Sequence, residues 1–168
     1  INCRGATLEA CATQSGTLVG PLLTEVVGAT ELTPYKGGWC GNEIFPGAFS
    51  ESVRTKARDM AEKFGNQLLN EGYRGYFDLD FLIDIDTDEV YLGELNPRIC
   101  GASPMTNHAA FAYADAPLFL FHLLEFSGVP FDLNVKEINE RWAQPHFIDS
   151  WSQVVIKYTE NKVDQVTH

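Results

Sequence analysis

The sequence predicts an α+β fold in which a largely antiparallel sheet carries packed helices. Strand-like and helical stretches follow one another in the order strands, helix, hairpin, helix, strand. A helical apolar period begins near residue 50, and a strictly alternating stretch at 76–86 is followed at once by a second strand-like stretch. At 168 residues the chain is long enough for one domain with a sizeable core.

The chain opens with residues that favour strands. Residues 1–12 and 17–32 are rich in Thr, Val and Leu, and Gly16, Gly20 and Gly28 interrupt them. This pattern predicts two or three short strands joined by turns.

The stretch PYKGGWCGNEIFPG at 34–47 is predicted to be a loop because of its glycines and prolines. It carries polar and aromatic groups that a plain connection does not need, so we single out Lys36 and Asn42 as candidate binding residues. The alternative is a glycine-rich loop that is ordered by the packing of Trp39.

A helix is predicted from Ser50 to Asn70. Apolar residues recur there at spacings of three and four: Val53, Ala57, Met60, Ala61, Phe64 and Leu68. Ser50 is the candidate N-cap, and Gly72 is the candidate stop.

Two strands with a tight turn follow, at 76–86 and 89–96. The first alternates apolar with mostly acidic residues: Phe77, Leu79, Phe81, Ile83 and Ile85 on one face, and Asp78, Asp80, Leu82 and Asp84 on the other. After a polar turn, HAAFAYADAPLFLFHLLEFSG predicts a packed helical region that is broken near Pro117.

The turn between the two strands is DTD at 86–88. If Ile85 faces Glu89 across this turn, antiparallel pairing counted outward from there places Asp80 opposite Glu94. Like charges directly opposite each other destabilise a strand pair, so this register calls for a compensating group.

A divalent cation would supply that compensation. Mg²⁺ prefers hard oxygen ligands such as the carboxylates of Asp80 and Glu94, and Asn96, which faces Asp78 in the same register, adds a carbonyl oxygen. Arg98 cannot bind a metal, but its guanidinium matches phosphate oxygens in pairs. A metal beside an arginine suggests a polyphosphate substrate.

Two other interpretations stay open on spacing alone. The acidic residues of the hairpin could form a solvated face, with Arg98 paired to Glu94, and a slip of one residue would destroy the facing pair. The short DxD sequence of Asp78 and Asp80 is a minor alternative, since some sugar transferases use such a motif with Mn²⁺.

The composition of the chain limits the classes of partner and the cellular location that we expect. The net charge of −11 disfavours nucleic acid and anionic membranes as partners. No apolar run has the length of a membrane span, and residues 1–10 lack a signal-peptide pattern, so we expect a cytoplasmic protein. The four cysteines show no CxxC pair, and free thiols are expected.

The stretch DLDFLIDIDTDEVYLGELNPRICGASPMTN resembles the ATP-grasp superfamily, whose members carry an acidic residue in a DF or EF strand, a short hairpin and then ExNxR. These positions are Asp80, Glu94, Asn96 and Arg98. The resemblance implies that Asp80, Glu94 and Asn96 hold Mg²⁺, or alternatively Mn²⁺, that bridges the phosphates of ATP. It implies that Glu94 and Asn96 thereby bind the nucleotide and that Arg98 is the catalytic residue, which stabilises the reacting phosphate or acyl phosphate.

Within this superfamily the sequence is most similar to the biotin carboxylase and carbamoyl phosphate synthetase branch. Cys100 and Ala102 stand where biotin carboxylase has the Gln and Glu that manage bicarbonate. The resemblance therefore implies a carboxylate-amine ligase that uses ATP, a small carboxylate and an amine. A non-catalytic nucleotide-binding or regulatory module is the alternative, and a homodimer is left open.

The resemblance covers residues 1–125, which would form the C-terminal half of an ATP-grasp domain. Residues 126–168 would be a connecting segment that leads into a truncated C-terminal region. The superfamily's glycine-rich ATP loop and ATP-binding lysines have no counterpart in the sequence, so the fragment alone is expected to be inactive. Lys36 and Asn42 lie where members often contact phosphates or the acceptor.

Overall fold

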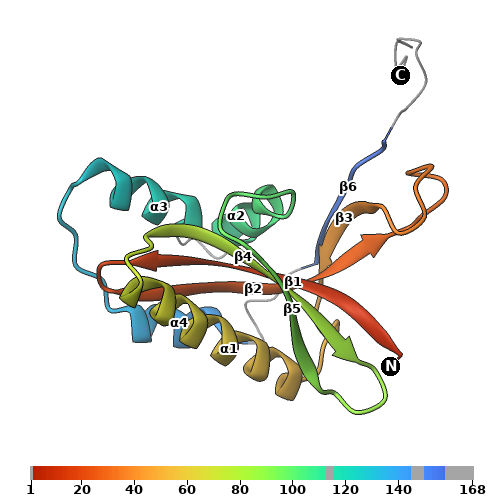
Figure 1. Ribbon diagram of the computed structural model, residues 1–168, viewed down its shortest axis with the longest axis horizontal. Helices are drawn as coiled ribbons and strands as arrows, with labels where there is room; N and C mark the ends of the chain where they lie inside the picture. The colour runs from red at the N-terminus through yellow and green to blue at the C-terminus, as the bar shows by residue number, and fades with distance from the viewer. Residues whose placement is uncertain (1, 113–115, 145–149, 158–168) are drawn as a thin grey trace, which may run out of the picture.

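The computed structural model describes residues 2–112, 116–144 and 150–157, and it shows a six-stranded sheet between helices (Figure 1). The strands are β1 (Cys3–Thr13), β2 (Gly16–Val27), β3 (Trp39–Ile44), β4 (Gly75–Asp84), β5 (Val90–Asn96) and β6 (Trp151–Val154). The helices are α1 (Glu51–Asn70), α2 (Ser103–Ala112), α3 (Leu118–Ser127) and α4 (Val135–Trp142). The strand order is β5-β4-β1-β2-β3-β6, every pair is antiparallel, and the predicted α+β class is confirmed.

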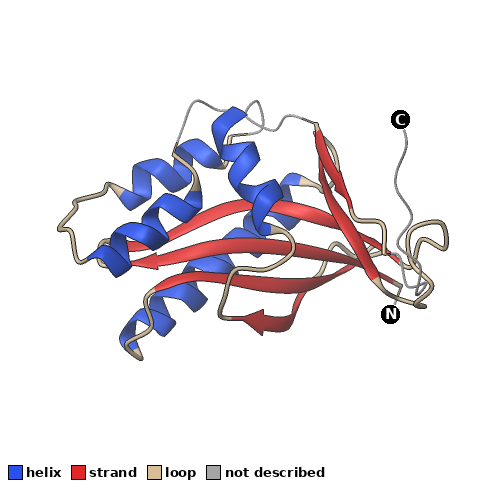
Figure 2. Ribbon diagram, turned by 90° about the horizontal axis from the view of Figure 1, so that it is seen from above, coloured by secondary structure: helices blue, strands red, loops and turns tan. Residues whose placement is uncertain are grey.

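The helices cover both faces of the sheet. Helices α2 and α3 lie on one side of the long strands and α1 and α4 on the other (Figures 1 and 2). No helix within the described residues has the length and apolar character that a membrane span requires.

The main core lies between α1 and the sheet, as the apolar patterns predict. The Ser50 side chain accepts a hydrogen bond from the Val53 amide at the start of α1, and Gly72 adopts a φ of 87° just beyond its end. The apolar face of β4 is buried against this helix through Phe77, Leu79, Phe81 and Ile83. Each such buried side chain stabilises the fold by roughly 1.5–3 kcal/mol.

Strand β3 corrects the prediction of a loop across 34–47. Its residues pair with β2 on one side and with β6 on the other. Gly41 has a φ of 140°, and a side chain there would collide with the Gln153 carbonyl of β6. This glycine therefore marks a close approach of two strands rather than a loop.

The first part of β2 is an edge that α4 covers. The Asn139 side chain accepts a hydrogen bond from the Val19 amide at 2.9 Å and donates one to the Thr17 carbonyl at 2.9 Å. Arg58 donates to the carbonyls of Val19, Gly20 and Asn139, and burial lowers its pKa to about 10. Covering an edge in this way blocks its pairing with another strand.

The elements after residue 125 pack on the same sheet. Helix α4 contacts β2, and β6 forms the outermost strand beside β3. The division at residue 125 stays a prediction, and residues 158–168 lie outside the described residues.

Candidate functional site

The predicted facing pairs of the hairpin are present. Asp80 pairs with Glu94 and Asp78 pairs with Asn96 in the β4–β5 ladder. Their side chains therefore lie on one face of the sheet, opposite the face that α1 covers.

The tip of the hairpin differs from the prediction by one residue. Ile83 pairs with Val90, and Glu89 accepts a hydrogen bond from the Asp84 amide rather than facing Ile85. The register shifts between Asp80 and Phe81, where Gly93 is the extra residue on β5. This bulge restores the predicted register at the acidic pair.

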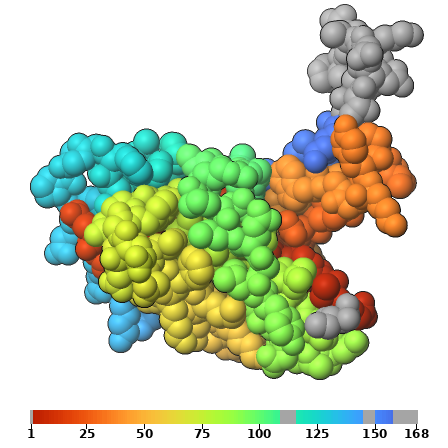
Figure 3. Space-filling model, in the orientation of Figure 1, coloured from red at the N-terminus to blue at the C-terminus, as the bar shows by residue number. Residues whose placement is uncertain are grey.

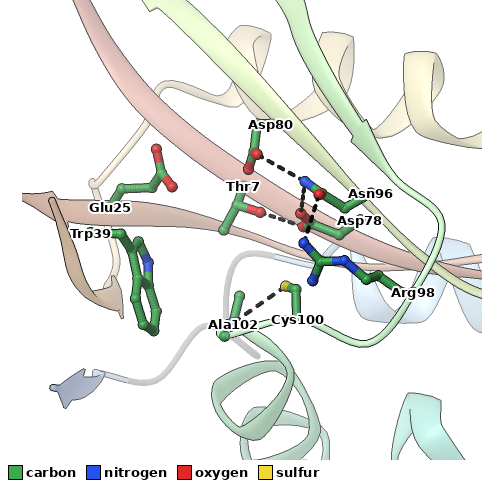
Figure 4. A pocket seen from close by; sticks show the side chains of 10 residues that line it. Thr7, Glu25, Trp39, Asp78, Asp80, Asn96, Arg98, Cys100 and Ala102 are labelled. Atoms are coloured by element: carbon green, nitrogen blue, oxygen red, sulfur yellow. Dashed lines mark hydrogen bonds between the residues drawn. The ribbon is translucent and has the colours of Figure 1, made fainter. Parts of the chain in front are cut away.

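Strand β1 brings Thr7 and Glu9 beside this pair, because Thr7 pairs with Asp80 and Glu9 with Asp78. The buried Asp78 carboxylate accepts hydrogen bonds from Thr7 Oγ1 and from Asn96 Nδ2. The same Asn96 nitrogen lies 3.2 Å from Asp80 Oδ2 (Figure 4). One amide group thus holds the two aspartates in place.

Arg98 lies at the other end of this network. Its Nη2 donates to Asn96 Oδ1 at 3.1 Å, and its Nη1 donates to the Ile99 carbonyl at 3.3 Å. Although both side chains are described, no ion pair joins Arg98 to Glu94, so the alternative in which these two residues pair is not what the structure shows.

These side chains surround a cavity of about 210 Å³. Its walls are formed by Thr7, Glu25, Trp39, Asp78, Asp80, Asn96, Arg98, Cys100, Gly101 and Ala102 (Figure 4). In the space-filling view the β4–β5 hairpin forms part of the visible surface of the molecule (Figure 3). Glu94 lies on β5 and does not line the cavity. Of the charged side chains that line the cavity, three are acidic and one is basic: Glu25, Asp78 and Asp80 against Arg98.

The pKa values of the three carboxylates that line the cavity are raised, which favours their protonated forms. Burial, and next the charge of Glu94, raise the pKa of Asp80. Burial, with added contributions from Asp80 and Glu9, raises the pKa of Asp78 to about 7. Burial and then the charge of Asp80 raise the pKa of Glu25 to about 7. A bound cation would oppose these shifts.

Lys36 and Asn42 do not line the cavity. Lys36 is exposed in the turn between β2 and β3. Asn42 is fully buried, donates to the Thr24 carbonyl, and accepts from Gln153 Nε2, which also donates to the Gly101 carbonyl at 2.6 Å. Asn42 thus supports the segment that forms one cavity wall, and the predicted contacts of both residues with a nucleotide stay predictions.

A buried network around Glu9 fixes the segment that follows β5. The Glu9 carboxylate accepts hydrogen bonds from Ser103 Oγ, from Cys100 Sγ at 3.1 Å and from the Tyr76 hydroxyl at 2.7 Å. Burial raises the pKa of Glu9, and burial followed by the charge of Glu9 raises the pKa of Cys100. The thiol therefore stays protonated and donates. No local sequence pattern points to Glu9, because strand pairing brings these groups together.

Within the part of the chain that the structure describes, we consider two groups of side chains as ligands for a metal ion. Ligand atoms of Glu9, Asp78 and Cys100 lie within 4.8 Å of one another, but three donors already occupy the Glu9 carboxylate and a protonated thiol is a poor ligand. Asp80 and Glu94 offer facing carboxylates, and Asn96 Oδ1 keeps a lone pair besides the one that Arg98 uses. This hard oxygen set fits Mg²⁺.

Comparison with solved structures identifies the fold. N5-carboxyaminoimidazole ribonucleotide synthetase from Thermus thermophilus matches with a TM-score of 0.54 and 21% identity, over 76% of this chain and 31% of that chain. A biotin carboxylase–βγ-ATP complex from Campylobacter jejuni matches with a TM-score of 0.59 and 14% identity, over 82% and 28%. A pyruvate carboxylase variant from Rhizobium etli matches with a TM-score of 0.61 and 13% identity, over 88% and 12%.

These matches are to ATP-grasp enzymes. The chain has the ATP-grasp fold. It corresponds to the C-terminal part of the ATP-grasp module, as predicted, and it spans about 30% of the length of the ribonucleotide synthetase and biotin carboxylase chains. A scan against protein families and a search of curated proteins each find no match to the sequence.

Proposed function

We propose that this chain forms the metal-binding and phosphate-binding part of an ATP- and Mg²⁺-dependent ligase. The enzyme would activate a carboxylate as an acyl phosphate, which an amine then attacks. The observation that carries the proposal is the facing Asp80–Glu94 pair, with Asn96 and Arg98 beside it, on an ATP-grasp fold. One matched structure, carboxyaminoimidazole ribonucleotide synthase from Aspergillus clavatus, is a complex with ATP.

Each residue has a distinct part in this reaction. Asp80, Glu94 and Asn96 would hold Mg²⁺, which when bound neutralises charge on the phosphates. The Asn96 amide also keeps Asp78 and Asp80 in place through its Nδ2. Arg98 is exposed at the cavity, and the guanidinium donors that Asn96 and Ile99 do not use can bind oxygens of the transferring phosphoryl group.

The cavity wall supports an amine rather than bicarbonate as the second substrate. The Cys100 thiol points its donor at Glu9, and Ala102 is buried against Leu23, Ile44 and Met105. Neither side chain can orient or deprotonate bicarbonate. This wall therefore favours carboxylate–amine ligation over carboxylation.

Metal binding is the first test, and the 168-residue chain itself is suitable for it. Electron paramagnetic resonance with Mn²⁺ as the probe should show binding that Asp80→Asn and Glu94→Gln each weaken about tenfold or more. Asp86→Asn, in the exposed turn of the same hairpin, removes the same charge away from the site and should leave the affinity unchanged. Unchanged Mn²⁺ affinity in both site variants would overturn the proposal.

The ligase reaction itself needs the full-length protein that contains these residues. Release of ADP should there depend on both a carboxylate and an amine. MgATP binding without ADP release across a panel of carboxylates and amines would instead favour a non-catalytic nucleotide-binding module.

A further inference from the structure

Glu25 lines the cavity, and neither the metal role nor the phosphate role uses it. It is half-buried on β2, and its carboxylate makes no hydrogen bond or ion pair with any residue in 2–112, 116–144 or 150–157. Its Oε2 lies over Gly5 of β1, a position whose missing side chain leaves room for the carboxylate. The Glu25 carboxylate therefore lies at the cavity without a partner among the described residues.

The charges around the cavity leave Glu25 uncompensated. Asp78 is satisfied by Thr7 and Asn96, and Asp80 is assigned to the cation. Arg98 is engaged with Asn96 and stands on the other side of the cavity from Glu25 (Figure 4). A half-buried carboxylate that faces another carboxylate is unfavourable unless a positive group joins it. This wall of the cavity thus favours a cationic ligand.

Trp39 gives the same wall a second feature that suits a cation. Its indole stands beside Glu25 at the cavity (Figure 4), and Gly101 packs so closely on the ring that a side chain there would lie 2.6 Å from it. Lys157 Nζ lies 5.8 Å from the ring centroid, within the range of a cation–π contact. Tryptophan is the aromatic residue that binds cations best.

We propose that Glu25 and Trp39 form a subsite for the ammonium group of a cationic amine, which, on the basis of the function proposed above, is the acceptor substrate. Glu25 pairs with the charge, and the Trp39 ring lies against the alkyl and ammonium atoms. Arg98, across the cavity, is left to the phosphoryl group. The acceptor class is therefore an amine that enters protonated, rather than a neutral alcohol or an anion.

The Trp39 indole N–H signal in ¹H–¹⁵N NMR tests this subsite on the chain as it is. The signal is assigned with Trp39→Phe, and the probes are butylamine and its neutral analogue butanol in mildly alkaline buffer. Butylamine should shift the signal saturably and butanol should not. Glu25→Gln should weaken the butylamine effect about tenfold, whereas Glu31→Gln, an equal charge change on an exposed turn, should not. Equal effects in the two variants, or an equal shift with butanol, would overturn the subsite.

Mn²⁺ binding by the same variants separates this inference from the proposed function. Glu25→Gln should keep the Mn²⁺ affinity of the unmodified chain. A loss as large as that of Asp80→Asn would assign Glu25 to the metal and overturn the ammonium subsite. Glu25-dependent butylamine binding by a chain that binds no Mn²⁺ would sustain the subsite and defeat the ligase proposal.

Discussion

Asp80 and Glu94 stand directly opposite each other in the β4–β5 ladder, so two like charges share one position of an antiparallel pair. Such a pair is unfavourable by itself, and burial followed by the charge of Glu94 raises the pKa of Asp80. A cation between the two carboxylates would turn this repulsion into attraction. The stability of the protein should therefore depend on both the bound metal and the pH.

The stability of the metal-free protein should fall as the pH rises from the acid range through about 7. Burial raises the pKa of both Asp78 and Glu25 to about 7, from ordinary values of 3.8 and 4.5. Between those values and about 7 the folded chain binds more protons than the unfolded chain, so each unit of pH costs stability. The melting temperature in EDTA should be higher near pH 5.5 than near pH 8.

Mg²⁺ should oppose this trend, since its positive charge, held by Asp80 and Glu94, favours the ionised forms of the neighbouring Asp78 and Glu25. It should raise the melting temperature more near pH 8 than near pH 5.5, as measured by differential scanning calorimetry. Asp78→Asn should flatten the metal-free profile. If the melting temperature of the metal-free protein rises from pH 5.5 to pH 8, the raised pKa values of Asp78 and Glu25 are contradicted.

Arg98→Lys should lower kcat of the full-length enzyme about 10²–10³-fold, because lysine cannot donate two parallel hydrogen bonds to a phosphoryl group. MgATP affinity should stay nearly unchanged, since the metal ligands remain. Steady-state ADP release and isothermal titration calorimetry measure the two quantities. Arg74→Lys, an exposed arginine that donates to the Leu69 and Tyr73 carbonyls, is the matched control. A normal kcat for Arg98→Lys would remove Arg98 from the catalytic step.

Glu9→Ala should destabilise the fold strongly. It would leave the buried donors of Ser103 and Tyr76 and the half-buried thiol of Cys100 without their acceptor, at about 1–3 kcal/mol for each fully buried donor. Urea denaturation should therefore show a loss of about 3 kcal/mol or more. Glu31→Ala, on an exposed turn, should change stability by less than about 0.5 kcal/mol. A similarly small change for Glu9→Ala would show that the network contributes little.

Gly41→Ala should disrupt the β3–β6 pairing, because the new methyl group would collide with the Gln153 carbonyl. Gly47→Ala is the matched control: it also adds a methyl group at positive φ, 84°, but with open space around it. The control should cost about 1–2 kcal/mol of backbone strain, and Gly41→Ala should cost clearly more. Equal losses in urea denaturation would mean that the close approach of β6 to Gly41 is not maintained in solution.

Local signals account for the parts of the fold that the sequence predicts well. The N-cap Ser50, the apolar period of α1 and the alternation of β4 each lie within one element. The facing of Asp80 and Glu94 is also predicted, although the hairpin tip is wrong by one residue and the bulge at Gly93 corrects the count. A bulge of this kind leaves no clear local pattern other than a glycine in a strand.

The rest of the site comes from distant strands, which local patterns cannot pair. Thr7 and Glu9 reach Asp80 and Asp78 only because β1 lies beside β4. Glu25 reaches the cavity only because β2 lies next to β1. The glycines around β3 favour a loop on propensity, and the pairing of β3 with two neighbouring strands overrides that preference.

The side-chain amide of Asn139 takes the place of a neighbouring strand on β2. It makes the hydrogen bonds with the Thr17 carbonyl and the Val19 amide that the backbone of such a strand would make. A chain that ends at residue 125 would lack Asn139, which covers β2, and β6, which pairs with β3. The exposed backbone groups of β2 and β3 could then pair with a second molecule. Sedimentation velocity should show that such a shortened chain associates with itself more than the 168-residue chain does. Removal of residues 126–168 should therefore lower the solubility of the chain although Asp80, Glu94, Asn96 and Arg98 all remain in it.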